Sequence, residues 1–224
     1  MNQDIIHVYF MPGMAASSKI FENIQLPDNQ FRMHYLEWEI PDNNETLTAY
    51  ALRMIKNIHH ENIALIGVSF GGVLVQEMSK HLKLKRLIII SSVSTKHELP
   101  KRMKIARKTK AYSWAPTSLV SQIDTIAKFA FGSNVKKRLE LYKKYMTVAD
   151  KRYLDWALKE MVCWDQDTPI PGIIHIHGDK DMVFPFHNIQ DCIKIIGGTH
   201  IMILNKFRWF NRHLPSLILY GKEA

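Results

Sequence analysis

A serine lies at the apex of a glycine-rich turn between a predicted strand and a predicted helix. The apolar run at residues 63–66 ends at the hexapeptide GVSFGG, and apolar residues with helical spacing follow up to Leu82. This is G-x-S-x-G in the strand–turn–helix context that a nucleophile elbow requires. Because Gly67 and Gly71 let strand and helix approach closely, we expect the Ser69 hydroxyl to project into a cleft. The pattern alone is equally typical of an ordinary strand–helix connection. Residues elsewhere in the chain are needed to distinguish the two.

Strands and helices alternate over the first ninety or so residues. Alternating or β-branched runs predict strands, and apolar residues three and four apart predict helices. The strands are expected at residues 4–11, 32–39, 63–66 and 86–93, and the helices at 15–24, 45–59 and 73–82. Such an order implies parallel strands with helices covering the sheet.

The alternation breaks between residues 94 and 168, where only helical patterns occur (101–111, 118–131, 135–146 and 149–162). Strands return at 172–177 and 191–196, and a helix interrupted by Pro215 follows at 201–219. We therefore predict an α/β fold with a mostly parallel sheet of about six strands. Its core domain comprises residues 1–93 and 169–224, and residues 94–168 form an inserted helical cap.

Composition places the chain among globular proteins. With 224 residues and 46% hydrophobic content it can bury a core. It has no apolar run long enough to span a membrane, and its N-terminus lacks the basic region of a secretory signal. Cys163 and Cys192 form no motif, which favours a reduced, cytoplasmic setting, although their spacing leaves a disulfide open.

The net charge of +9 is concentrated in the predicted cap. Between Lys96 and Arg152 there are fifteen basic and four acidic residues, a net charge of +11, so the rest of the chain is slightly acidic. The cap is either a solvated basic surface or a site that attracts an acidic partner or anionic substrate. No nucleic-acid-binding motif accompanies it, and we do not expect a nucleic-acid ligand.

Three residues of complementary chemistry follow three predicted strands. Ser69 follows the third strand, the segment HGDKDMVFP with Asp179 and Asp181 follows the fifth, and GGTH with His200 follows the sixth. A serine needs a base to take its proton, and a histidine needs a carboxylate to orient it. Because active sites of open α/β sheets gather at the carboxyl ends of the strands, these side chains are expected to meet there.

The segments GVSFGG, HGDKDMVFP and GGTH resemble the elbow, acid loop and histidine loop of the α/β-hydrolase fold, and the resemblance extends over essentially the whole chain. It implies Ser69, Asp181 and His200 as catalytic residues, with Asp179 as the alternative acid. It also implies a sheet without the two extra strands of longer members. The function that it implies is a serine esterase or thioesterase acting on a small-molecule ester or acyl thioester, with no cofactor.

The resemblance also implies an oxyanion hole made by the backbone N–H groups of Phe70 and Met14, although this chain has Pro12-Gly13 where many members have His-Gly. Trp164 and Val183 are candidate substrate-pocket residues. Some cap-bearing relatives, such as the esterase that acts on pimeloyl-carrier-protein methyl ester, meet acyl carrier protein through basic cap residues. An acidic protein of this kind is therefore a possible partner by analogy.

Alternative functions use the same residues. A carbon–carbon hydrolase or lyase, or a cofactor-free perhydrolase, would share the three catalytic residues, and a binding or signalling module would keep the fold without turnover. His175 and His177 share one face of a strand, but no cysteine or carboxylate cluster accompanies them, so we expect hydrogen-bonded histidines and no metal site.

Overall fold

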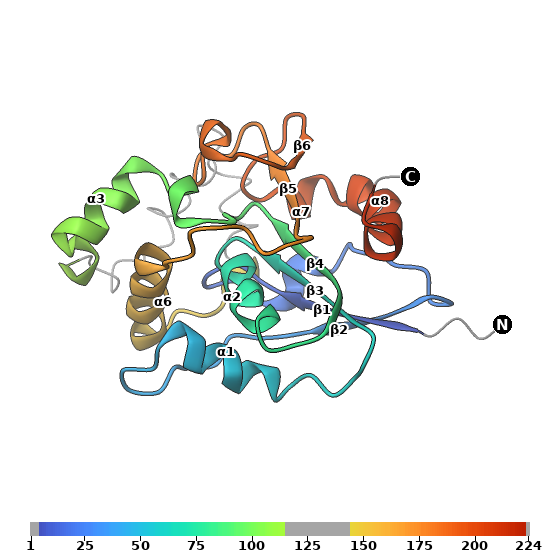
Figure 1. Ribbon diagram of the computed structural model, residues 1–224, viewed down its shortest axis with the longest axis horizontal. Helices are drawn as coiled ribbons and strands as arrows, with labels where there is room; N and C mark the ends of the chain where they lie inside the picture. The colour runs from blue at the N-terminus through green and yellow to red at the C-terminus, as the bar shows by residue number, and fades with distance from the viewer. Residues whose placement is uncertain (1–4, 115–143, 223–224) are drawn as a thin grey trace.

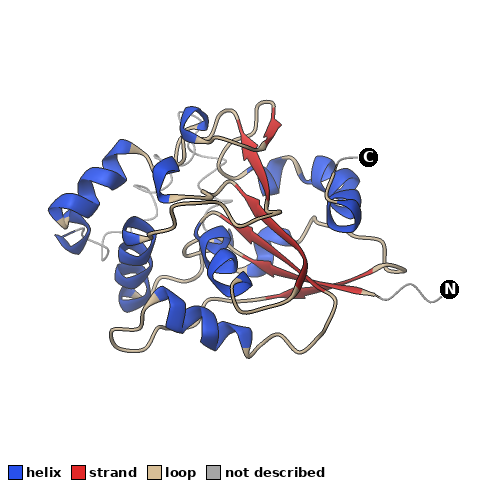
Figure 2. Ribbon diagram, in the orientation of Figure 1, coloured by secondary structure: helices blue, strands red, loops and turns tan. Residues whose placement is uncertain are grey.

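Six parallel strands form one sheet in the computed structural model, which describes residues 5–114 and 144–222 (Figures 1 and 2). The order is β2-β1-β3-β4-β5-β6, and every neighbouring pair is parallel. The strands are β1 (Ile6–Met11), β2 (Phe31–Tyr35), β3 (Ile63–Val68), β4 (Leu84–Ile90), β5 (Ile174–Gly178) and β6 (Ile193–Ile195). The predicted six-stranded α/β fold is confirmed.

The central strands are hydrophobic along their length because helices cover both faces of the sheet. Every residue of β3 is buried, as are the last four residues of β4, Leu87 to Ile90. Parallel sheets covered on both sides favour such continuous apolar runs over strict alternation. The apolar side chains of β1, β3 and β4 divide between two separate cores, one on each face.

Helices α1 and α2 cover one face, together with α6, and helices α7 and α8 cover the other with the short 3₁₀ helix η1 (Figure 1). Their bounds are α1 (Leu47–Ile55), α2 (Phe70–Ser79), α6 (Lys151–Cys163), α7 (Met202–Asn205), α8 (Phe207–Tyr220) and η1 (Ser18–Phe21). The second helix runs directly from the serine turn, with nine of its ten residues buried. The turn is therefore anchored at both ends in the core.

Two helix predictions were wrong. Residues 15–24 form only the four-residue η1, because Ala15 adopts a left-handed φ of 63° and the segment is tied to residues distant in sequence. The C-terminal helix is broken near Lys206, whose φ is −115°, and not at Pro215, which lies inside α8. Proline removes one backbone N–H, but Leu214 and Leu217 beside it are buried against the sheet and keep the helix in place.

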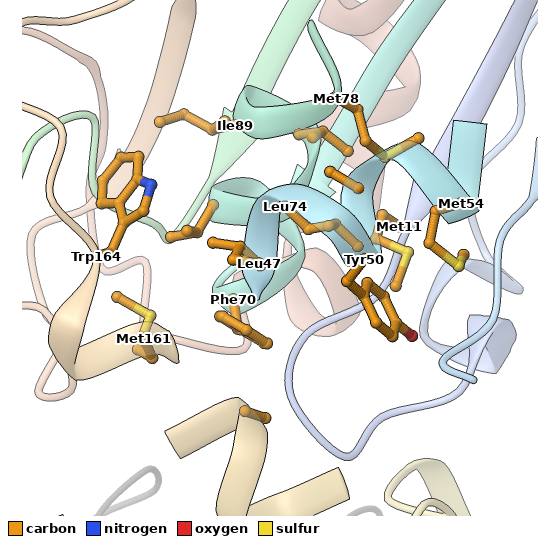
Figure 3. Packing of buried hydrophobic residues seen from close by; sticks show 14 of the residues in the cluster. Met11, Leu47, Tyr50, Met54, Phe70, Leu74, Met78, Ile89, Met161 and Trp164 are labelled. Carbon is orange, nitrogen blue, oxygen red and sulfur yellow. The ribbon is translucent and has the colours of Figure 1, made fainter. Parts of the chain in front are cut away.

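Helix α6 packs on the core of the sheet (Figure 3). The Trp156 indole N–H donates to the Glu45 carbonyl over 2.8 Å, and its ring lies 4.4 Å from that of Tyr50. Helix α3 (Lys101–Thr109), near the start of the segment 94–168 that ends with α6, has no buried residue. The predicted helices at 118–131 and, in large part, 135–146 lie outside the described residues. A separate cap at 94–168 remains a prediction.

Neither cysteine forms a disulfide: Cys163 and Cys192 are free and partly buried. Within residues 5–114 and 144–222, no helix is long and apolar enough to cross a membrane.

Candidate active site

Ser69 occupies a strained turn at the carboxyl end of β3. Its φ of 53° and ψ of −121° lie in a region that residues with a side chain rarely adopt. Two hydrogen bonds hold it there: its N–H donates to the Ile90 carbonyl over 2.9 Å, and its carbonyl accepts from the Ser92 hydroxyl over 2.7 Å. Both partners belong to the end of the neighbouring strand β4 or its turn, so the sheet itself fixes the serine backbone.

The glycines around the serine are required by close backbone contacts. A Cβ at Gly67 would lie 2.3 Å from the Gly71 carbonyl oxygen, and one at Gly71 would lie 2.2 Å from the Pro12 carbonyl oxygen. Neither contact can be relieved by moving a flexible side chain. The strand, tight turn and helix predicted around GVSFGG are therefore present, and the turn after β1 lies directly against this turn.

The structure brings Ser69, His200 and Asp181 into one chain of hydrogen bonds. His200 Nε2 lies 2.9 Å from Ser69 Oγ, and His200 Nδ1 lies 2.9 Å from Asp181 Oδ2. Asp181 lies in the turn that follows β5, and His200 lies between β6 and α7. The three side chains come from the carboxyl ends of three strands, as the parallel topology predicted.

The Asp181 side chain has no solvent exposure, yet it is built to be ionised. Its Oδ1 accepts the backbone N–H groups of Val183 and Phe184 over 2.8 and 2.9 Å. Burial by itself raises the pKa of this carboxyl, but His200, His177 and the Phe184 N–H outweigh burial and hold the pKa below its ordinary value. Asp181 is therefore an anion that can only accept a hydrogen bond from His200.

Asp179, the alternative acid, has a different task. Its carboxylate accepts the backbone N–H of Gly197 over 2.7 Å, on an exposed part of the loop. Gly197 adopts a left-handed φ of 66° at the start of the segment that carries His200. Asp179 thus holds the histidine loop in place, and Asp181 is the carboxylate that contacts the imidazole.

Two buried histidines lie behind Asp181. His177 Nε2 is 3.5 Å from Asp181 Oδ2 and 2.9 Å from the Phe184 carbonyl, and His177 Nδ1 is 3.1 Å from His175 Nε2. Sequence reasoning expected hydrogen-bonded histidines here, and the structure confirms it. It missed the contact of His177 with Asp181, although the short spacing between the two residues was a usable signal.

Replacing His175 is expected to weaken the dependence of stability on pH. Burial, then the neighbouring His177, lowers the pKa of His175 to about 3, whereas an unfolded histidine has a pKa of about 6.5. The unfolded chain therefore binds the extra proton first, and stability falls as the pH drops below about 6.5. Between pH 7 and 5 this one group removes roughly 2 kcal/mol.

Urea unfolding at the two pH values measures this effect. His175→Gln should lose less stability on acidification than wild type, while His81→Gln, at an exposed site, should lose as much as wild type. An unchanged pH slope in His175→Gln would contradict the assignment.

The two expected oxyanion donors belong to the residue after Ser69 and to the turn after β1. Phe70 is the first residue of α2, so its N–H has no partner within the helix. Within the described residues, no hydrogen bond occupies the N–H of Phe70 or of Met14. A Cβ built on Gly13, beside Met14, would lie 3.3 Å from the Ser69 Cβ, which places this turn against the serine. Their role as donors to a ligand remains a prediction.

The two candidate pocket residues differ in their surroundings. Trp164 is buried at the end of α6 (Figure 3). Its indole N–H donates to the Glu77 carboxylate over 2.9 Å. Val183 is partly buried, and its carbonyl accepts from Arg102 of α3 over 3.1 Å. Val183 lies next to the Asp181 turn, whereas Trp164 packs in the core. Their contact with a substrate remains a prediction.

Solved structures of distant proteins share the whole fold. An esterase from Exiguobacterium antarcticum aligns with a TM-score of 0.71 and 17% identity, covering 97% of this chain and 93% of its own. An enol-lactonase from Burkholderia xenovorans LB400 has a TM-score of 0.68, 12% identity and coverage of 93% and 89%. A thermophilic esterase from Thermogutta terrifontis has a TM-score of 0.63 and 13% identity, and the alignment covers 94% of this chain and 88% of the esterase.

No protein-family model matches the chain, and no curated protein matches its sequence. The structural matches nevertheless extend over nearly its full length. The chain has the α/β-hydrolase fold.

Proposed function

We propose that the protein is a serine hydrolase that cleaves a carboxylic ester or thioester through an acyl-enzyme. The observation that carries the proposal is the hydrogen-bonded series from Ser69 through His200 to the buried Asp181, built on a strained turn. The proteins of like fold named above include two esterases and an enol-lactonase, which supports the same class of reaction. At 12–17% identity they support a hydrolase without specifying its substrate.

In the proposed reaction, His200 Nε2 takes the Ser69 proton as Oγ attacks the carbonyl carbon. The negative charge that develops on the carbonyl oxygen is accepted by the N–H groups of Phe70 and Met14. The alcohol or thiol leaves with the proton from His200, and an acyl group remains on Ser69. A water that gives its proton to His200 then attacks the acyl carbon and releases the acid. Asp181 holds His200 Nδ1–H throughout and stabilises the imidazolium.

We also propose that an acidic partner, such as acyl carrier protein, presents the substrate at a basic cap formed by residues 94–168. Its support is the net charge of +11 between Lys96 and Arg152. Within the described residues, part of that charge is neutralised locally, since Lys96 contacts both Asp165 and Asp167 over 2.8 Å. The basic residues at 115–143 lie outside the described residues. A free acyl ester and a carrier-bound acyl thioester are thus the two substrate classes to compare.

Covalent labelling tests the proposed function directly. A fluorophosphonate should add one equivalent to wild-type protein, with the adduct located on the peptide that contains Ser69. Attack requires the hydroxyl to be activated by His200, so unfolded protein should take up no label. Wild-type protein without an adduct, or equal labelling of Ser69→Ala, would overturn the proposal.

A further inference from the structure

Three histidines meet on one face of the sheet, away from the serine turn. His7 lies on β1 and His34 on β2, and the register of these strands pairs His34 with Tyr9, two residues from His7. Because side chains two residues apart share a face, His7, Tyr9 and His34 point the same way. His60 comes from the segment that precedes β3. We call His7, His34 and His60 the histidine cluster.

The imidazoles of the histidine cluster are in direct contact. His7 Nδ1 lies 2.9 Å from His34 Nε2, and the rings of His7 and His60 stack with centroids 3.7 Å apart. One nitrogen from each of the three residues lies within 4.8 Å of the others. Apolar side chains could fill the same space without bringing polar nitrogen atoms together. Packing alone therefore does not explain three imidazoles in contact.

We propose that His7, His34 and His60 bind a divalent transition-metal ion, with Zn²⁺ as the best match. Zinc takes imidazole nitrogens at about 2.0–2.1 Å in tetrahedral geometry, which places the ligand nitrogens about 3.4 Å apart. The His7–His34 pair is already closer than this, so a metal would replace the shared proton between them. His60 is exposed and can turn out of its stack until its nitrogen lone pair points at the ion.

One member of the histidine cluster already has a hydrogen-bond partner of the kind that orients a metal-bound histidine. His60 Nδ1 lies 2.6 Å from the Tyr9 hydroxyl. When His60 donates its Nδ1–H to that oxygen, its Nε2 lone pair is free for the ion. Metal-bound histidines commonly have such a partner on the second nitrogen.

A fourth coordination position would face a surface pocket of about 550 Å³ that includes His34 and His60 in its lining. Its two carboxylates have other partners: Glu37 accepts the Ser18 N–H, and Glu39 contacts Arg53 and Asn57. Because both carboxylates already have partners, we do not count them among the proposed metal ligands. Three protein ligands with one open position define a site that can also take water or a small ligand from the pocket.

This site is separate from the serine. His7 pairs with Ile63, the first residue of β3, whereas Ser69 follows the last residue of that strand. The ion would join β1, β2 and the segment before β3, and its binding should raise the thermal stability of the native chain. The inference does not depend on the proposed hydrolase function.

The test uses untagged protein with Zn²⁺ and Co²⁺ salts, because a histidine tag would bind both. Calorimetry should show one saturable Zn²⁺ site per chain, the melting temperature should rise by a few degrees at a hundredfold excess over Kd, and Co²⁺ should give the visible absorption of a tetrahedral complex. His34→Gln and His60→Gln should each weaken binding at least tenfold.

His81→Gln, which removes an exposed histidine outside the cluster, is the matched control and should bind like wild type. His60→Gln changes an exposed side chain, so it separates lost ligation from lost folding, and circular dichroism of the metal-free variants checks the fold. Absence of saturable binding by wild type, or binding by the folded His34→Gln and His60→Gln variants equal to that of wild type, would overturn the proposal.

Discussion

Replacing Ser69 by alanine is expected to lower the rate of ester hydrolysis by roughly 10⁴-fold or more. The hydroxyl is the only atom group removed, and His200 Nε2 loses the proton donor that lies 2.9 Å away. The backbone of the turn remains held by Ile90 and Ser92, and alanine carries the same Cβ as serine. Folding should therefore survive while acyl-enzyme formation is lost.

The measurement is kcat/KM on a series of p-nitrophenyl esters and acyl thioesters. Wild type and variant are compared at a temperature at which both are fully folded. Ser79→Ala is the matched control, because Ser79 ends the same helix and its hydroxyl donates to the Gln76 carbonyl. It should keep activity within a factor of a few. A Ser69→Ala variant within tenfold of wild type on the best substrate would rule out Ser69 as the nucleophile.

The convergence of the site could be predicted because it follows from topology. Once strands are assigned and parallel, residues that follow them must gather at one edge, however far apart they lie in sequence. This reasoning placed Ser69, His200 and the loop that carries Asp179 and Asp181 together without any knowledge of loop conformation. The close approach required at Gly67 and Gly71 was predictable for the same reason, since strand and helix must meet at the turn.

Features that depend on strand register could not be predicted. The pairing of Tyr9 with His34 that assembles the histidine cluster arises from how β1 and β2 are aligned, which neither strand encodes alone. His60 lies in the segment before β3, and its neighbours in sequence do not indicate that it meets His7 and His34. The helix predicted at 15–24 failed in a similar way: its local spacing was helical, but long-range bonds such as Ala15 N–H to the Tyr153 hydroxyl favour another path.

The choice between two aspartates depends on loop geometry. Asp179 and Asp181 are two residues apart, and the sequence pattern allows either to reach His200. Backbone donors separate their roles: Val183 and Phe184 point at Asp181, and Gly197 points at Asp179. Such contacts form only after the loop has closed, so the family resemblance favoured Asp181 and the hydrogen bonds now supply the physical reason.

Asp181→Asn is expected to lower kcat/KM by roughly 10⁴-fold with little change in the geometry of the site. The Asn oxygen should take the place of Oδ1, because that position accepts the N–H groups of Val183 and Phe184. The amide NH₂ would then face His200 Nδ1, which must become an acceptor. The imidazole proton moves to Nε2, where it blocks removal of the Ser69 proton.

Asp179→Asn is the matched control. The asparagine oxygen can still accept the Gly197 N–H, so the histidine loop should stay in place and activity should fall less than tenfold. Both variants are compared by kcat/KM, by thermal melting and by fluorophosphonate labelling, which should slow strongly only in Asp181→Asn. The reverse ranking, with Asp179→Asn inactive and Asp181→Asn near wild type, would assign the acid to Asp179. Because the two substitutions make the same chemical change two residues apart, a general effect of lost negative charge cannot produce the expected difference.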